Sequence, residues 1–363
     1  MSKSTVRLWT KSADLSRRKW TILAFVAFVC FCVYTIVSRH DGTNGRSGAI
    51  LARTYHRLGK IVMNQGQRSS KDNPHTEGDL GEETVVLYNR VPKTGSTTLL
   101  GIIDQLSLTN SYQAINFNIS RLQRVLGLAD QRRFVTNISN WEEVKPVVYH
   151  GHLAFLDFQS YGVKQLPIYI NMVRDPLERL MSHYYFLRYG DDFDPHRARK
   201  MASDQTTFDE CVEQDGAECG PIKMWVQIPF FCGHHAGCWE PGNEWALEEA
   251  KRNLREKYLV VGITEEFSYF LAVLEAALPR FFRGATDLYE RGSQSHLRKT
   301  NKKILPSLTT LLKMEKSRVY RMEREFYSHA VDQFHFIRDT TIGMTETRKL
   351  YIRQKSIHFN KIR

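Results

Sequence analysis

The sequence contains no internal repeat, no low-complexity tract and few cysteines, six among 363 residues. None of the cysteines stands in a C-x-x-C pair, which argues against the usual structural zinc sites. The motif G-x-x-x-x-G-K-[ST] is absent as well, which argues against a loop for nucleoside triphosphates. Hydrophobic residues make up 42% of the chain and charged residues 25%, a composition typical of globular proteins rather than of disordered or collagen-like chains.

Basic residues outnumber acidic ones by 51 to 39, which gives a formal net charge of +12. Six basic residues and one acidic residue lie within residues 1–37, a net of +5, so the remaining 326 residues carry +7. A moderate positive field of this kind suits an anionic partner, although it does not identify one.

Residues 20–37 form a run of eighteen residues without a charge. As a helix this run would extend about 27 Å, which is enough to span a bilayer core. It is longer than the apolar region of a cleaved signal peptide and has no clean small-x-small cleavage site. The six cations before it place the N-terminus in the cytosol by the positive-inside rule. We therefore expect a type II protein with a cytosolic tail (1–19), a transmembrane signal anchor (20–37), a lumenal stem (38–82) and a catalytic domain (83–363).

Two features of the chain agree with a lumenal domain. Residues 38–82 are rich in Gly, Ser, Asn, Asp and His, as expected for a stem. Asn118 and Asn137 each begin an Asn-Ile-Ser triplet, which is an acceptor sequence for N-glycosylation. Such triplets also arise by chance, so they support the lumenal assignment only together with the predicted topology.

Four cysteines, Cys211, Cys219, Cys232 and Cys238, lie within 28 residues. An even set in an oxidising lumen predicts two disulfides, for which three pairings exist. The neighbour pairing, Cys211–Cys219 and Cys232–Cys238, is the simplest. The alternative is a zinc site that uses the two histidines between the last two cysteines.

From residue 84 onward, short β-branched runs alternate with helical stretches. The predicted strands are 84–88, 147–150, 168–173 and 258–263, and they read as buried parallel strands. The predicted helices are 96–106, 176–187, 245–256 and 266–278, followed by a long amphipathic helix whose apolar stripe is Val319, Met322, Phe326, Ala330 and Phe334. This alternation predicts a single α/β domain with a central parallel sheet flanked by helices.

The first predicted strand is followed by the segment RVPKTGSTT (90–98) and then by an apolar helix. A strand, a tight loop and a helix turn backbone N–H groups and the positive helix end toward a phosphate. Gly95 allows a close approach of the backbone, and Lys93 supplies a positive charge. A polar loop with an N-cap serine is the alternative interpretation of this segment taken alone.

A second motif follows the predicted strand 168–173, where Arg174-Asp175-Pro176 starts a helix and Ser182 comes eight residues after Arg174. PKTGST and RDPxxRxxS, each after a strand, are how sulfotransferases hold 3′-phosphoadenylyl sulfate. Together with YHGH (149–152), YINMVRDPLERL, QIPFFCGH, LEAALPRFFRGAT and SHLRKT, they make the chain resemble the heparan sulfate 2-O-sulfotransferases from about residue 84 to 340. The resemblance implies a sulfotransferase-type domain with a 5′-phosphosulfate loop.

The resemblance implies which residues bind the donor, 3′-phosphoadenylyl sulfate, without a metal. The 5′-phosphosulfate would lie on Lys93, Thr94, Gly95, Ser96 and Thr97. The 3′-phosphate would lie on Arg174 and Ser182. A later segment would close over the donor with Tyr289, Ser295, Arg298, Thr300 and Lys303.

Transfer to a sugar hydroxyl requires a base, and histidine titrates in the right range. His150 and His152 flank Gly151, so strand alternation predicts both side chains on one face. A His-x-His pair can bind a metal, but the family uses none. We assign His152 as the general base, His150 as its partner and Lys93 as the group that stabilises the leaving oxygen.

The acceptor implied by the resemblance carries carboxylates and N-sulfates, which arginine binds through its bidentate fork. Arg90, Arg199 and Arg298 match basic positions that bind substrate in the family. Two positions depart from the family pattern, because Asp104 replaces a tyrosine and Asn116 replaces a histidine. Both departures bear on acceptor affinity and on the choice between iduronate and glucuronate.

The implied activity is transfer to the 2-hydroxyl of uronic acid in heparan sulfate, by a Golgi membrane enzyme that forms homotrimers. The uronosyl epimerase is an expected partner, and nucleic acid is not. Alternatives are a dermatan or chondroitin uronyl 2-O-sulfotransferase, an inactive heparin-binding protein of the same fold, and a Golgi kinase. The HGH triplet argues against the first, the intact Lys93, His152, Arg174 and Ser182 against the second, and the missing triphosphate loop against the third.

Overall fold

The computed structural model describes residues 83–117, 124–191, 199–292, 302–344 and 350–352. The predicted cytosolic tail, anchor and stem lie outside these residues, as do Cys30 and Cys32. Within the described ranges, no helix combines the length and the apolar character needed to cross a membrane.

A five-stranded sheet, parallel throughout, forms the centre of the domain, with the strand order β2-β3-β1-β4-β5. Its strands are β1 (Val85–Asn89), β2 (Gln113–Asn116), β3 (Val147–Gly151), β4 (Ile168–Val173) and β5 (Tyr258–Ile263). The three central strands are almost fully buried, which explains why β-branched and other apolar residues dominate their sequences. The expected parallel α/β sheet is confirmed.

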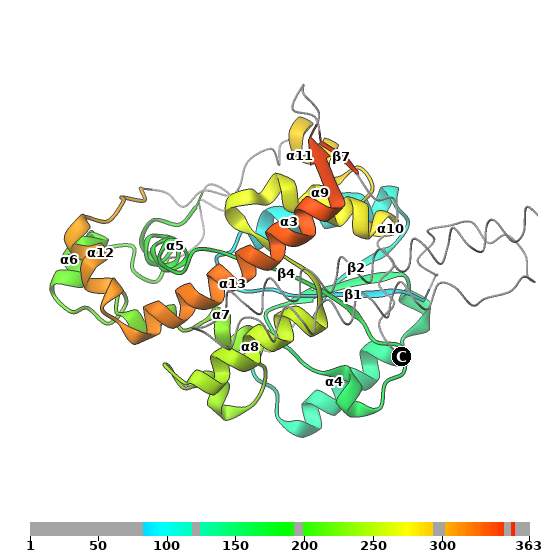
Figure 1. The fold of residues 1–363 in the computed structure, drawn as a ribbon, viewed down its shortest axis with the longest axis horizontal. Helices are drawn as coiled ribbons and strands as arrows, with labels where there is room; N and C mark the ends of the chain where they lie inside the picture. The colour runs from blue at the N-terminus through cyan, green and yellow to red at the C-terminus, as the bar shows by residue number, and fades with distance from the viewer. Residues whose placement is uncertain (1–82, 118–123, 192–198, 293–301, 345–349, 353–363) are drawn as a thin grey trace, which may run out of the picture. The chain divides into compact units, whose positions relative to one another are not determined.

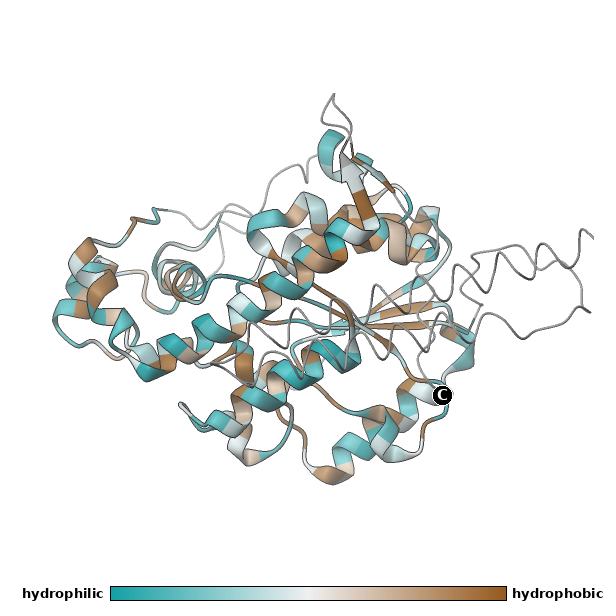
Figure 2. Cartoon of the chain, viewed as in Figure 1, coloured by the Kyte–Doolittle hydropathy of each residue, from teal (hydrophilic) through white to brown (hydrophobic). Residues whose placement is uncertain are grey.

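Helices cover both faces of this sheet. Figure 1 shows α3, α9 and α10 on one side and α4, α7 and α8 on the other, while α13 crosses in front. Figure 2 shows apolar residues along the strands and polar residues on the outward surfaces of α8 and α13. The bounds are α3 (Ser96–Thr109), α4 (Leu128–Asn140), α5 (Pro176–Tyr189), α6 (Phe208–Glu213), α7 (Gln227–Cys232), α8 (Glu244–Lys257), α9 (Phe267–Ala277), α10 (Pro279–Phe282), α11 (Ala285–Arg291), α12 (Leu308–Glu315) and α13 (Arg318–Thr341).

Two predicted strands, 168–173 and 258–263, match β4 and β5 residue for residue, and β1 is shifted by one residue from 84–88. The long amphipathic helix is α13, whose residues Met322, Phe326, Ala330 and Phe334 are buried as expected. The sequence did not predict β2, the short helices α6, α7, α10, α11 and α12, or α4. A small antiparallel pair, β6 (Ile342–Met344) and β7 (Leu350–Ile352), was not predicted either.

A second, smaller core joins α5, α6 and α12 beyond the carboxyl end of the sheet (Figure 1). The disulfide Cys211–Cys219 lies in this core. The second disulfide, Cys232–Cys238, ties the end of α7 to the following turn. Both bonds follow the expected neighbour pairing. The zinc alternative is wrong, because Cys232 and Cys238 are bonded to each other instead of being free thiolates.

Candidate functional site

The predicted functional groups gather at the carboxyl edge of the sheet. In the parallel register, Asn89 at the end of β1 lies beside Gly151 at the end of β3. The chain leaves β1 toward β2 on one side, whereas β4 and β5 lie on the other side, so the topology reverses between β1 and β4. Open α/β sheets bind ligands at such a reversal, outside the carboxyl ends of the strands. The phosphate loop follows β1 and Arg174 follows β4, so the two predicted donor-binding motifs flank the reversal point.

The loop after β1 is folded so that it leads directly into the N-terminus of α3. Lys93 and Gly95 both adopt a left-handed backbone, with φ of 68° and 80°. The Thr94 hydroxyl donates to Val91 O at 3.0 Å, and the hydroxyl of Thr264, after β5, lies 2.9 Å from Thr94 O. The first turn of α3 carries no acidic residue, which leaves the positive helix end available to an anion.

The side chain of Lys93 contacts α5. Its Nζ lies 4.0 Å from the centroid of the Phe186 ring, so a cation–π contact holds the ammonium group beside the loop. This places a positive charge next to the helix end that is expected to receive the 5′-phosphosulfate.

His152 follows β3 and is held by the backbone of β1's extension. Its Nδ1 lies 2.8 Å from Arg90 O, and the Arg90 N–H in turn donates to Gly151 O at 2.8 Å. A carbonyl oxygen can only accept, so this bond requires a proton on Nδ1. In the neutral ring, Nε2 is therefore the basic nitrogen.

His150 is buried inside β3, and its Nδ1 has no hydrogen-bond partner within the described residues. The Nε atom of Arg90 is also buried and has no hydrogen-bond partner within the described residues. Unsatisfied buried polar atoms are rare, and at a sheet edge of this kind they fit a site that binds a polar ligand. His150 also lies in register with Asn116 of β2, so this departure from the family pattern is a direct neighbour of the histidine pair.

The two histidines are neutral at physiological pH. Desolvation by the surrounding protein and the charge of Arg90 lower the pKa of His150 to about 4, with a further contribution from His152. The same two causes lower the pKa of His152 to about 4, although its ring remains open to solvent and the bond to Arg90 O acts in the opposite direction. A neutral His152 can accept a proton, as a general base must.

Gly151 is required between the two histidines. A Cβ atom there would overlap the Phe117 ring and lie 2.8 Å from Phe117 O. Phe117 N donates to His150 O at 3.0 Å, so the segment after β2 packs directly on the HGH triplet.

Arg174 is positioned by a buried polar network that the sequence did not predict. The side chain of Gln227 accepts from Arg174 N through Oε1 and donates to Arg174 O through Nε2, both at 2.9 Å. Gln227 Nε2 also lies 3.4 Å from the carboxylate of Glu323, which accepts from Val226 N at 2.9 Å and Ile228 N at 3.1 Å. Glu323 is fully buried in α13, and burial raises its pKa to about 7.

The side chain of Arg174 bonds to Glu178 on α5 at 3.2 Å. Glu178 also pairs with Lys303, so one carboxylate joins two residues that were assigned to the donor site. Ser182 is buried on the same helix, two turns after Arg174. Arg174, Ser182 and Lys303 thus lie on or against α5.

The other predicted site residues are less closely grouped in the described chain. Tyr289 lies on α11 and packs against Phe267, with ring centroids 5.0 Å apart. Arg199 lies close to the backbone of Gly190, just after α5. Asp104 lies eight residues into α3, more than two turns from the phosphate loop. Ser295, Arg298, Thr300 and Asn118 lie outside the described residues.

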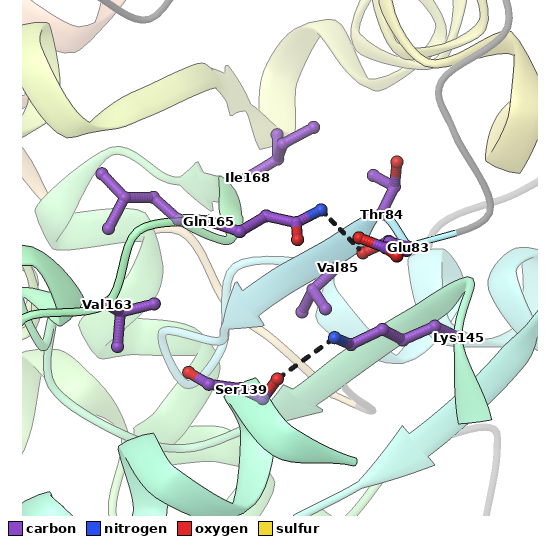
Figure 3. Close-up of a pocket in the computed structure, with 9 residues that line it drawn as sticks. Glu83, Thr84, Val85, Ser139, Lys145, Val163, Gln165 and Ile168 are labelled. Atoms are coloured by element: carbon purple, nitrogen blue, oxygen red, sulfur yellow. Dashed lines mark hydrogen bonds between the residues drawn. The ribbon is translucent and has the colours of Figure 1, made fainter. Parts of the chain in front are cut away.

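A pocket of about 240 Å³ lies at the opposite, amino edge of the sheet (Figure 3). Glu83, Gln165 and Lys145 are among its lining residues, and they bond within the protein. Gln165 Nε2 donates to Glu83 O at 3.3 Å, and Lys145 Nζ donates to Ser139 O at 3.1 Å. None of the predicted site residues lines it, so this pocket is separate from the candidate site.

The sequence matches the family model described as the sulfotransferase family over residues 80–330. It is 46% identical to heparan sulfate 2-O-sulfotransferase 1 of Homo sapiens over 346 residues, which cover 95% of this chain and 96% of that protein. It is 50% identical to heparan sulfate 2-O-sulfotransferase 1 of Gallus gallus over 343 residues, 94% of each chain. It is also 49% identical to heparin sulfate O-sulfotransferase of Drosophila melanogaster over 258 residues, 71% of this chain and 74% of that protein.

Proposed function

The chain belongs to the sulfotransferase family, and from that premise we propose that it sulfates the 2-hydroxyl of uronic acid in N-sulfated heparan sulfate. The donor would be 3′-phosphoadenylyl sulfate. The observation that carries the proposal is the meeting of the phosphate loop, His152 and Arg174 at one edge of the sheet. The names of relatives that are 46% and 50% identical over almost the whole chain support the choice of acceptor.

The donor would lie across the reversal point of the sheet. Lys93, Thr94, Gly95, Ser96 and Thr97 would bind the 5′-phosphosulfate, since they combine a helix N-terminus, hydroxyl groups and an ammonium group without a nearby acidic residue in the first turn. The 3′-phosphate would bind Arg174 and Ser182. It would compete with Glu178 for Arg174 and Lys303, since both cations pair with that carboxylate.

In the reaction, His152 Nε2 would accept the proton of the attacking 2-hydroxyl as the new oxygen–sulfur bond forms. The bond between sulfur and the phosphate oxygen of the donor breaks in line with the attack, and Lys93 stabilises the charge that develops on this oxygen. The products are a sulfate ester, adenosine 3′,5′-bisphosphate and a proton on His152. His150 would position the base or the acceptor.

The acceptor would be held by Arg90, Arg199 and Arg298, which suit carboxylate and sulfate groups. Asp104 and Asn116 remove an aromatic ring and an imidazole found in the family pattern. We therefore propose transfer to N-sulfated heparan chains with a weaker preference for iduronate over glucuronate. The rival acceptor is the uronate of dermatan or chondroitin sulfate.

The cellular setting is part of the same proposal. A type II anchor at residues 20–37 would hold the chain in the Golgi membrane, with a stem at 38–82 and the catalytic domain, 83–363, in the lumen. A homotrimer and contact with the uronosyl epimerase are expected from the family resemblance. The basic N-terminal tail and the uncharged run support the topology.

The test is transfer of radiolabelled sulfate by the purified full chain to three polymers. These are N-sulfated heparosan, its epimerised form and dermatan sulfate, each followed by disaccharide analysis. We expect 2-O-sulfated uronate in both heparosan-derived polymers. Product on dermatan sulfate alone would overturn the heparan assignment, and no product on any polymer would favour an inactive binding protein.

A further inference from the structure

Two exposed basic residues, Arg124 and Lys223, act on His183 of α5. The ion pairs of the described chain include many of its basic residues, yet Arg124 and Lys223 form none with any described carboxylate. Both residues are exposed, so each presents a positive charge to solvent. Basic residues without an ion pair are common on protein surfaces. The position of Arg124 and Lys223 relative to the candidate site is what suggests a role in binding.

Lys223 is fixed against α5. The buried side chain of Arg179, on α5, donates through Nη2 to the carbonyl oxygens of Lys223 and Met224, at 3.0 and 3.2 Å. His183 lies one turn after Arg179 on the same face of the helix, and Phe186, which stacks under Lys93, lies three residues further along. This face of α5 therefore connects Lys223 to the phosphate loop through His183.

Arg124 approaches from the other side. Its carbonyl oxygen accepts from Ala154 N at 3.0 Å, and Ala154 is two residues after His152. The Arg124 guanidinium lies over the Phe230 ring of α7, 5.8 Å from the centroid. Because α7 begins only three residues after Met224, the aromatic ring under Arg124 belongs to the same short stretch of chain as Lys223.

The charges that act on His183 and His152 agree with this arrangement. After desolvation, the charges of Arg179, Lys93, Arg124 and Lys223 lower the pKa of His183 to about 4. Arg124 also contributes to the lowered pKa of His152. No carboxylate is among the causes of either shift, so the side-chain charges that act on His183 and His152 are all positive.

We propose that Arg124, His183 and Lys223 form an anion subsite that binds a sulfate group on the glucosamine next to the acceptor uronate. The inference rests on the proposed function and extends it to residues that neither sequence motif contains. Arginine and lysine are suited to sulfate, and the neutral imidazole of His183 can donate one hydrogen bond. Arg124 is bonded to Ala154, two residues after the proposed base, so we assign the subsite to the acceptor instead of the 3′-phosphate of the donor.

The test compares Arg124→Gln and Lys223→Gln with the unmodified full chain, saturated with adenosine 3′,5′-bisphosphate. Binding of an N-sulfated heparosan hexasaccharide is measured by calorimetry, and transfer to the same oligosaccharide gives KM and kcat. Each variant should weaken binding and raise KM about tenfold, because a charge-assisted hydrogen bond is lost, while kcat changes less than about twofold. Arg124→Lys should recover part of the affinity, which loss of folding would not allow.

The control is Lys164→Gln, an exposed lysine in the loop that enters β4 at the opposite edge of the sheet, which should bind like the unmodified chain. Two further hexasaccharides, one with only N-sulfates and one with only 6-O-sulfates, identify the sulfate that the subsite binds. The variants should lose affinity only for the hexasaccharide that carries this sulfate.

Three outcomes separate the subsite from the proposed function. Normal transfer with unchanged acceptor binding in both variants overturns the subsite alone, as does an equal loss of affinity for adenosine 3′,5′-bisphosphate. Binding that depends on Arg124 and Lys223 without any transfer supports the subsite and overturns the proposed function. An unmodified chain that neither binds nor transfers overturns both.

Discussion

A backbone carbonyl determines which ring nitrogen of His152 is free to accept a proton. The Nδ1–H group of His152 donates to Arg90 O, and the Arg90 N–H itself donates to Gly151 O. The tautomer is thus set by the backbone rather than by a carboxylate. The bond to this neutral carbonyl raises the pKa of the ring, but desolvation and the charge of Arg90 lower it by more.

Replacing His152 with alanine should reduce turnover by about two to four orders of magnitude, the usual effect of losing a general base. The unmodified chain should show an acid limb in kcat/KM well below pH 6.5. Only the neutral ring accepts a proton, so activity is present above the pKa of the free enzyme, about 4, and falls as pH drops through it. Stopped radiolabel assays between pH 4 and 8 would measure this limb.

Calorimetric affinity for adenosine 3′,5′-bisphosphate serves as the control for His152→Ala, since it should not change. Near-normal turnover in that variant would move the base to His150 or to another residue. An acid limb centred at pH 6.5 would mean that the site does not lower the pKa of His152.

Gly151→Ala should disable the site without touching a charged group. The added Cβ would overlap Phe117, whose carbonyl oxygen cannot move without breaking the alignment of β2 with β3. We expect a loss of about 1–3 kcal/mol in the free energy of unfolding, the usual result of overpacking, together with a fall in kcat. Urea unfolding and the transfer assay measure the two effects, and Gly127→Ala, where a Cβ meets nothing within 4 Å, is the matched control. Equal behaviour of the two variants would contradict the prediction.

At the scale of elements, α13 and α7 act together on the residue after β4. Glu323 of α13 binds the backbone N–H groups at the start of α7, and Gln227 at that start binds both backbone groups of Arg174. The position of Arg174 therefore depends on a helix that begins almost 150 residues later in the sequence. No local motif contains this dependence.

Gln227→Ala should lower the affinity for the 3′-phosphate of the nucleotide and leave binding at the 5′ site unchanged. The unmodified chain should bind adenosine 3′,5′-bisphosphate more tightly than 5′-AMP, and Arg174→Ala should remove most of that preference, worth roughly 1.5–3 kcal/mol for a charge-assisted bond. Gln227→Ala should remove part of it, because the arginine is present but no longer held. Calorimetry with both nucleotides measures the preference, and a Gln227→Ala preference equal to that of the unmodified chain would show that Gln227 has no positioning role.

The elements that the sequence predicted are those whose pattern is local. The strand β5 is a continuous apolar run and β4 is interrupted only by Asn171, so the bounds of both follow from the sequence. The apolar stripe of α13 repeats with the helical period, which predicts the helix but not its bounds. The edge strand β2 reads QAIN, with both ends exposed, and has neither signal. The helix α7 reads QIPFFC, which is too short and too uniformly apolar to show a period.

The same distinction holds for the site. The phosphate loop and the RDP motif could be found because each is contiguous and follows a strand. The sequence does not identify the roles of Glu323, Gln227 and Arg124. A glutamate in an amphipathic helix usually faces solvent, and only the packing of α13 on α7 buries Glu323. Arg124 and Lys223 look like ordinary surface cations until the fold brings both to α7 and α5.

For the whole molecule, the predicted topology requires the catalytic domain to pass into the secretory lumen. Cys211–Cys219 and Cys232–Cys238 agree with an oxidising compartment, in which such bonds persist. Asn137 is exposed on the surface of α4, so its side chain is accessible to a glycan. Asn118, the other acceptor, lies outside the described residues.

Glycosidase treatment of the full chain expressed in animal cells should therefore increase its gel mobility. The physical reason is the topology, because acceptor triplets are modified only on the lumenal side, and the six cations before residue 20 keep the N-terminus in the cytosol. Asn137→Gln should reduce the shift, and the double variant with Asn118→Gln should abolish it, which makes the double variant the control. A chain without any shift, or a C-terminal tag that protease reaches from the cytosolic side of sealed vesicles, would place the catalytic domain on the wrong side of the membrane for this topology.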